Sequence, residues 1–129
     1  MNKYDDIRAR LDRGDCEVVC LCGSTRFMDA YERAIYEFTL EGIIILSVGV
    51  SKYFAPDHGA EAIGPDCADM LDELHLRKID MADRIHVLNV GGYVGPSTRR
   101  EVEYAIRQKT QVTWLEPDKI PPWAGRRKT

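Results

Sequence analysis

Apolar positions along this chain switch repeatedly between two spacings, which predicts that strands and helices alternate. Apolar runs extend over Glu17 to Cys22, Ile43 to Val50, Arg84 to Val90 and Gln111 to Leu115. Short runs rich in valine and isoleucine are typical of strands that are buried on both faces. Four strands are therefore expected.

Helical spacing fills the intervals between these runs. One helix is expected to begin at Ser24 or Thr25 and to end at Gly42, a second to run from about Ala68 to Ala82, and a third from Thr98 to Lys109. Because strands joined by helices cross over with right-handed geometry, the pattern predicts a parallel sheet covered on both faces. We expect a three-layer α/β fold, Rossmann-like or flavodoxin-like, with four to five strands in the order 2-1-3-4.

The chain length favours one domain over residues 1–129. A polar segment at residues 1–15 precedes the first strand, and an irregular tail covers residues 117–129. The connection from Ser51 to Cys67 has two prolines and two glycines and little periodicity. Connections of this length inside a domain are usually functional, so this one is a candidate lid.

The balance of charged residues argues against some classes of binding partner. The net charge is −3 and the sequence pI is about 5.6, so the chain has no basic excess to neutralise a nucleic-acid polymer. The sequence also has neither a signal-peptide pattern nor an apolar run approaching the roughly 20 residues of a membrane span. These features predict a cytoplasmic protein with a small-molecule partner and no membrane contact.

The cysteines predict reduced thiols rather than a metal site. Cys16, Cys20 and Cys22 alternate along one expected strand, and Cys67 lies far away in sequence. Same-face neighbours on a strand are nearly 7 Å apart and the chain has no paired CxxC segment, so no bound metal is expected.

Candidate chemistry gathers in the two turns that follow the first and third strands. Ligands of open parallel sheets bind at the carboxyl ends of the strands. The first turn reads CGSTRF, in which Gly23 allows close backbone approach and Arg26 offers a cation. The second reads GGYVGPST and leads to Glu101, which is either a functional carboxylate or the last residue of a Thr98-x-x-Glu101 capping box.

These segments resemble the nucleoside 2′-deoxyribosyltransferase superfamily, which includes deoxynucleoside 5′-monophosphate N-glycosidases and pyrimidine nucleotide hydrolases. The resemblance spans roughly Val18 to Leu115. It consists of a strand leading into CGSxR, an ADxxxV strand that contains Asp83, and a glycine-rich turn leading into ExGxA at Glu101.

The resemblance implies roles for particular residues. It implies that Glu101 is the nucleophile that attacks the anomeric carbon. It also implies substrate binding by Asp83 and by the two turns, and an assembly of two or more copies. The residues implied in the turns are Gly23, Ser24, Thr25, Arg26, Phe27, Gly95, Ser97 and Thr98.

This chain departs from the family pattern at two positions. His75 stands where the family usually has an aspartate, and it is either an acid–base residue or a core histidine. Glu103 replaces the glycine of ExGxA. The short tail has no obvious counterpart of the Asp-Asn segment of true transferases, which favours hydrolysis over base exchange.

The leading hypothesis is hydrolysis of the N-glycosidic bond of a nucleoside 5′-monophosphate or related nucleotide, with no cofactor. The alternatives are a nucleoside 2′-deoxyribosyltransferase that exchanges bases and a nucleotide-binding sensor without turnover. A dinucleotide-dependent oxidoreductase is disfavoured because no GxGxxG follows the first strand.

Overall fold

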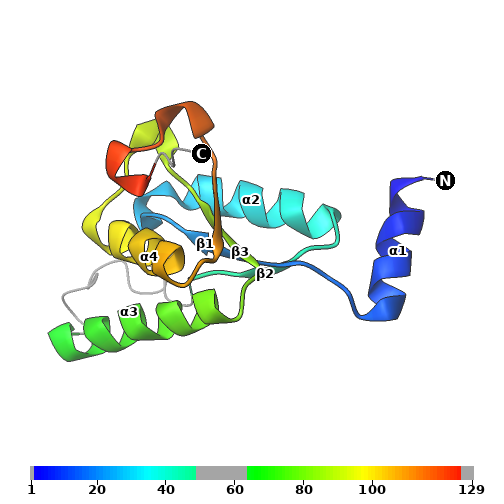
Figure 1. Ribbon diagram of the computed structural model, residues 1–129, viewed down its shortest axis with the longest axis horizontal. Coiled ribbons are helices and arrows are strands. Elements are labelled where there is room, and N and C mark those ends of the chain that lie inside the picture. The colour runs from blue at the N-terminus through cyan, green and yellow to red at the C-terminus, as the bar shows by residue number, and fades with distance from the viewer. Residues whose placement is uncertain (1, 49–63, 126–129) are drawn as a thin grey trace.

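A four-stranded parallel sheet forms the centre of the computed structural model, which describes residues 2–48 and 64–125 (Figure 1). The strand order is β2-β1-β3-β4, which confirms the predicted α/β fold and its strand order. The strands are β1 (Val18–Cys22), β2 (Ile44–Leu46), β3 (Arg84–Val87) and β4 (Gln111–Trp114).

Alternation along β1 divides the core into two layers. Val19 and Leu21 face α2 (Met28–Leu40), where they pack with Tyr31. Cys20 and Cys22 point to the other face, into the core formed with helices α3 (Gly64–Asp80) and α4 (Pro96–Arg107). The second layer thus places two thiols beneath α3 and α4. All four residues of β1 named here are fully buried.

The helices and outer strands differ from the predicted bounds in small but informative ways. A 3-10 turn at Thr25–Phe27 precedes α2, and α4 begins at Pro96 rather than at Thr98. The strand predicted to start at Ile43 is shorter at both ends in the described part, since β2 pairs only with Val18, Val19 and Cys20 of β1. Its last two predicted residues, like most of the candidate lid, lie outside the described residues.

The polar segment before the first strand contains a helix that the apolar pattern did not predict. Helix α1 (Lys3–Arg13) has a capping box between Asn2 and Asp5 and ends at Gly14, but it buries no residue of its own. Figure 1 shows α1 set apart from the sheet. Its contacts with the rest of the chain include Ile7 against Gly42, an ion pair of 2.6 Å between Lys3 and Glu41, and a hydrogen bond of 3.2 Å from Arg10 to the Glu41 carbonyl.

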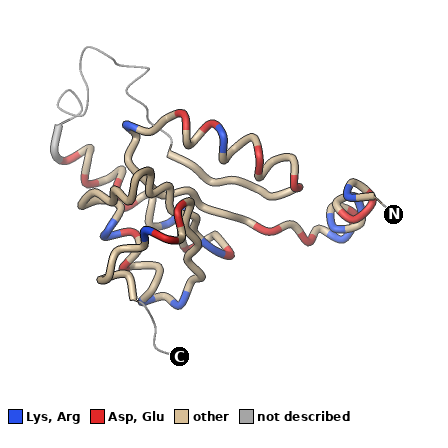
Figure 2. Tube along the Cα trace, turned by 90° about the horizontal axis from the view of Figure 1, so that it is seen from above, with Lys and Arg blue, Asp and Glu red and all other residues tan. Residues whose placement is uncertain are grey.

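The distribution of charged residues and the apolarity of the helices bear on two of the sequence predictions. Figure 2 shows that Lys and Arg positions are scattered along the described chain and interleaved with Asp and Glu. Among the described helices, none combines the length and the apolarity needed to cross a bilayer.

Candidate functional site

The turns after β1 and β3 are packed directly against each other. A Cβ atom on Gly23 would lie 3.1 Å from the Cβ atom of Leu88 and 3.3 Å from its carbonyl oxygen. The Tyr31 hydroxyl donates a hydrogen bond of 2.7 Å to the Gly23 carbonyl. A side chain at position 23 would therefore be crowded by Leu88, and glycine favours the close approach of these two backbone segments.

Aromatic and cationic side chains join the same two turns on their outer side. The guanidinium of Arg26 stacks on the ring of Tyr93 at 4.6 Å, and Phe27 meets that ring edge-on at 6.0 Å. Ser24 caps its own turn by accepting a hydrogen bond from the Arg26 backbone N–H. Arg26 and Phe27 thus lie beside Tyr93, which sequence reasoning did not single out.

The start of α4 excludes the capping-box interpretation of Glu101. The residue that precedes the helix is Gly95, and no side chain caps the helix there. Thr98 lies inside the first turn and is 4% exposed, so it is not the cap residue. Because Pro96 can take the first helical position at no hydrogen-bonding cost, the helix begins two residues earlier than predicted. Glu101 consequently lies beyond the first turn, where it serves no capping function.

Glu101 reaches into the protein beside His75. Its Oε1 atom lies 3.9 Å from His75 Nε2, and its side chain is 14% exposed. Burial raises the pKa of Glu101 to about 7, although the neighbouring His75 and a hydrogen bond with Cys22 oppose the shift. A carboxyl group with such a pKa exchanges protons readily at neutral pH.

His75 forms the centre of a compact buried cluster. Its Nε2 atom lies 3.1 Å from the Leu21 carbonyl oxygen, which can only accept, so Nε2 donates there. The Sγ atoms of Cys20 and Cys22 each lie 3.6 Å from the same nitrogen. Burial alone lowers the pKa of His75, but the hydrogen bond with Cys20 and the charge of Glu101 outweigh burial and raise it overall. His75 is thus a core residue that also lies close to the Glu101 carboxylate.

The positions of Cys20 and Cys22 contradict the argument that strand spacing keeps these two sulfurs too far apart to share a partner. Cys20, Cys22 and His75 each bring one ligand atom within 4.8 Å of the others, so α-carbon spacing along β1 does not keep the sulfurs apart from a shared partner. Sequence reasoning missed this cluster because His75 comes from α3, whose docking on β1 is a tertiary event. All four cysteines are free thiols, and Cys16 lies before β1 rather than in it.

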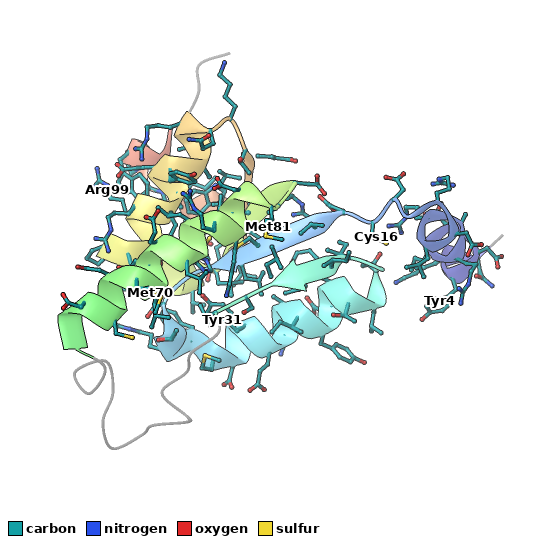
Figure 3. All side chains as sticks on the ribbon, turned by 90° about the horizontal axis from the view of Figure 1, so that it is seen from below. Tyr4, Cys16, Tyr31, Met70, Met81 and Arg99 are labelled. Atoms are coloured by element: carbon teal, nitrogen blue, oxygen red, sulfur yellow. The ribbon has the colours of Figure 1, made fainter. Side chains whose placement is uncertain are left out.

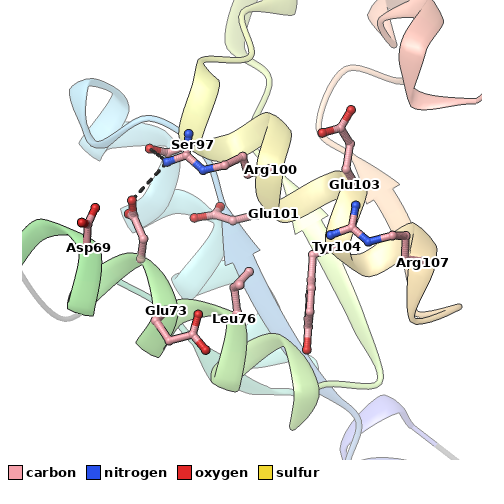
Figure 4. Close-up of a pocket in the computed structure, with 10 residues that line it drawn as sticks. Asp69, Glu73, Leu76, Ser97, Arg100, Glu101, Glu103, Tyr104 and Arg107 are labelled. Carbon is pink, nitrogen blue, oxygen red and sulfur yellow. Dashed lines mark hydrogen bonds and ion pairs between the residues drawn. The ribbon is translucent and has the colours of Figure 1, made fainter.

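A cavity of about 590 Å³ lies between α3 and α4, with Glu101 in its wall (Figure 4). Ser97 and Arg100 line it at the start of α4, and Arg100 forms an ion pair of 3.1 Å with Asp72. The volume is within the range of small-molecule sites. Carboxylates outnumber guanidinium groups in the lining; they are Asp69, Asp72, Glu73, Glu101 and Glu103.

The structure brings most, but not all, of the expected site residues to one edge of the sheet. The turn residues from Gly23 to Phe27 and the segment from Gly95 to Thr98 follow the carboxyl ends of β1 and β3. Asp83 lies at the opposite end of β3, where it accepts a hydrogen bond of 2.8 Å from the Val18 backbone N–H. Asp83 therefore holds β1 and β3 in register and is not part of this rim.

Comparison of the chain with family models and with curated protein sequences finds no match.

Proposed function

We propose that the chain hydrolyses the N-glycosidic bond of a nucleoside 5′-monophosphate or a related nucleotide, with Glu101 as the nucleophile. The observation that carries the proposal is the position of Glu101 in the wall of the cavity, beyond the helix cap and beside His75. Burial of a carboxylate that does not cap a helix costs folding free energy. Carboxyl groups with perturbed pKa values in cavities are typical of catalytic sites.

The reaction follows from the chemistry of a carboxylate beside a sugar. The Glu101 carboxylate attacks the anomeric carbon, the carbon–nitrogen bond to the base breaks, and the departing base takes up a proton. Water then attacks the same carbon, which breaks the glycosyl ester and restores the carboxylate. His75 lies 3.9 Å from Glu101, where the charge of a protonated imidazole stabilises the carboxylate anion.

Substrate binding in this proposal uses the two turns. The open N–H groups at the start of α4, near Gly95 and Ser97, favour an anion, and Arg100 adds a cation there. The aromatic pair of Phe27 and Tyr93 offers a surface for the base. Because the cavity lining carries more acidic than basic groups, we expect a monophosphate rather than a triphosphate.

Release of free base from a panel of nucleosides and nucleoside 5′-monophosphates, followed by chromatography, tests the proposal. Cleavage without an added acceptor base indicates hydrolysis, whereas cleavage that requires an acceptor base indicates base exchange. A thermal shift on ligand binding without any product would instead favour a nucleotide-binding sensor. If nothing in the panel is cleaved or bound, the proposal is wrong.

A further inference from the structure

Two thiols and an imidazole converge at the buried end of the Glu101 side chain, and the proposed reaction uses the imidazole but neither thiol. Cys20 and Cys22 come from β1 and His75 comes from α3, so the set links two elements of the fold. Thiolate sulfur and imidazole nitrogen are the preferred ligands of zinc in proteins. Carboxylate-only sites, by contrast, suit magnesium or calcium.

The distances match the edges of a tetrahedral zinc site. With zinc–sulfur bonds of about 2.3 Å and zinc–nitrogen bonds of about 2.0–2.1 Å, tetrahedral geometry places sulfur and nitrogen about 3.6 Å apart. Both sulfurs of the set lie 3.6 Å from His75 Nε2. Two of the edges of the tetrahedron therefore already have the required length.

A fourth ligand lies beside the first three. Glu101 Oε1 is 3.9 Å from His75 Nε2, and a tetrahedral site places an oxygen and a nitrogen ligand about 3.4 Å apart. A small rotation of the carboxylate closes this difference. Glu101 is the member of this set that also lines the cavity between α3 and α4.

We propose that Cys20, Cys22 and His75 bind one zinc ion, with Glu101 completing the coordination from the cavity side. Two thiolates balance the charge of the ion, and the remaining negative charge is that of Glu101, the ligand on the cavity side. Binding exchanges the hydrogen bond from His75 Nε2 to the Leu21 carbonyl for a bond to zinc, and the ring proton moves to Nδ1. The thiol protons pass to solvent.

This site has a consequence that rests on the proposed function. Zinc bound by Glu101 occupies the carboxylate that would attack the sugar. Zinc is therefore an inhibitory ligand in this protein, and not a cofactor of the reaction.

Zinc retention by tag-free protein tests the site independently of any activity. Chelator-treated protein is incubated with zinc chloride, desalted, and analysed by mass spectrometry of the metal. We expect one zinc ion per chain. We expect Cys20→Ser and Cys22→Ser to weaken zinc binding by about 100-fold or more, since even outer-shell changes cost tenfold to 100-fold.

The chain offers matched controls in its other two cysteines. Cys16 lies in the segment between α1 and β1 (Figure 3), and Cys67 lies near the start of α3. Cys16→Ser and Cys67→Ser should retain zinc as the unchanged protein does. Failure of the unchanged protein to retain zinc, or equal retention by Cys20→Ser and Cys22→Ser, overturns the site.

If Cys20→Ser and Cys22→Ser do not fold, the absorption spectrum of the unchanged protein with cobalt(II) still tests the site. Cobalt(II) replaces zinc in thiolate sites and gives a sulfur-to-cobalt charge-transfer band together with visible bands typical of tetrahedral geometry. We expect both features on addition of cobalt chloride and their loss on addition of zinc chloride. A spectrum of aqueous cobalt alone overturns the proposal. Failure to cleave nucleotides would not affect either measurement, so the proposed function and the zinc site fail separately.

Discussion

Glu101 Oε1 lies 3.9 Å from His75 Nε2, in a contact between α4 and α3 that leaves both side chains almost fully buried. A helix cap would instead place the glutamate at the exposed first turn, next to the residue that precedes the helix. The position of the pair therefore argues against the helix-cap interpretation of Glu101.

Glu101→Gln should abolish cleavage while leaving the fold intact. Glutamine keeps the shape of the side chain but cannot act as an anionic nucleophile, so we expect turnover to fall by several powers of ten, each equal to about 1.4 kcal/mol in the barrier. The amide also avoids the cost of burying a charge, so the melting temperature should not decrease. Base release and thermal unfolding measure the two effects.

Glu103→Gln is the matched control for this change. Glu103 is on the same helix and lines the same cavity, but it is more exposed and pairs with Arg99 at 3.1 Å. Its loss should change turnover by less than about tenfold, since exposed ion pairs contribute little. Near-normal turnover of Glu101→Gln would exclude Glu101 as the nucleophile.

Asn89→Ala should destabilise the protein by about 2–4 kcal/mol, because buried backbone groups would lose their partners. Asn89 is fully buried; its amide donates to the carbonyls of Glu116 and Lys119, and its oxygen accepts from the Glu116 N–H at 2.9 Å. Urea unfolding measures the change. Asn2→Ala, which removes an exposed helix cap, should cost about 1 kcal/mol or less. Equal effects of the two substitutions would contradict the buried role of Asn89.

Acidification should destabilise the protein through His86. Burial, with the charge of Arg84, lowers the pKa of His86 from 6.5 to about 4. Between these values the unfolded chain binds a proton that the folded chain does not bind, so stability is lost as the pH falls from about 6.5 towards 4. The Nδ1 atom of His86 lies 2.8 Å from the Thr113 hydroxyl, and His86→Gln keeps a donor there. Denaturation midpoints at pH 7 and pH 5 should differ less in the variant; an equal difference would rule out His86 as the cause.

A pair of glycine substitutions should measure how firmly α1 is attached. Gly14 and Gly42 both have left-handed backbone, with φ of 66° and 77°, so alanine strains each by roughly 1 kcal/mol. Only at Gly42 would the new Cβ atom meet a neighbour, 2.7 Å from Ile7. Gly42→Ala should therefore loosen α1 and speed proteolysis after residues of that helix, relative to Gly14→Ala. Equal cleavage rates would show that the contact between Ile7 and Gly42 does not help to hold α1 in place.

Local patterns were sufficient to predict the sheet but not α1. Each strand is a short apolar run whose neighbours are dictated by right-handed crossovers, and these signals lie within a few residues. Helix α1 is instead defined by its capping interactions, at Asn2 where it begins and at Gly14 where it ends, and it buries no apolar face. A search for apolar periodicity therefore passes over it, although the capping pattern was readable.

The candidate site was predictable only where its residues follow strand ends. The turns at Gly23 and Gly95 were found because parallel strands end at one edge of the sheet. The contacts of His75 with Cys20 and Cys22 depend instead on how α3 docks on β1, which no local pattern encodes. Asp83 shows the opposite error. Its position next to a strand was recognised, but it lies at the amino end of β3, away from the candidate site.

The place of β1 in the sheet also governs the order in which the chain can fold during synthesis. Strand β1 leaves the ribosome before both of its neighbours in the sheet, and Val18 meets Asp83 across a sequence separation of 65 residues. Until β3 emerges, the side of β1 that receives it has unsatisfied backbone groups and exposed apolar side chains. Nascent chains that stop short of β3 should consequently be the species most prone to aggregation and most dependent on chaperones.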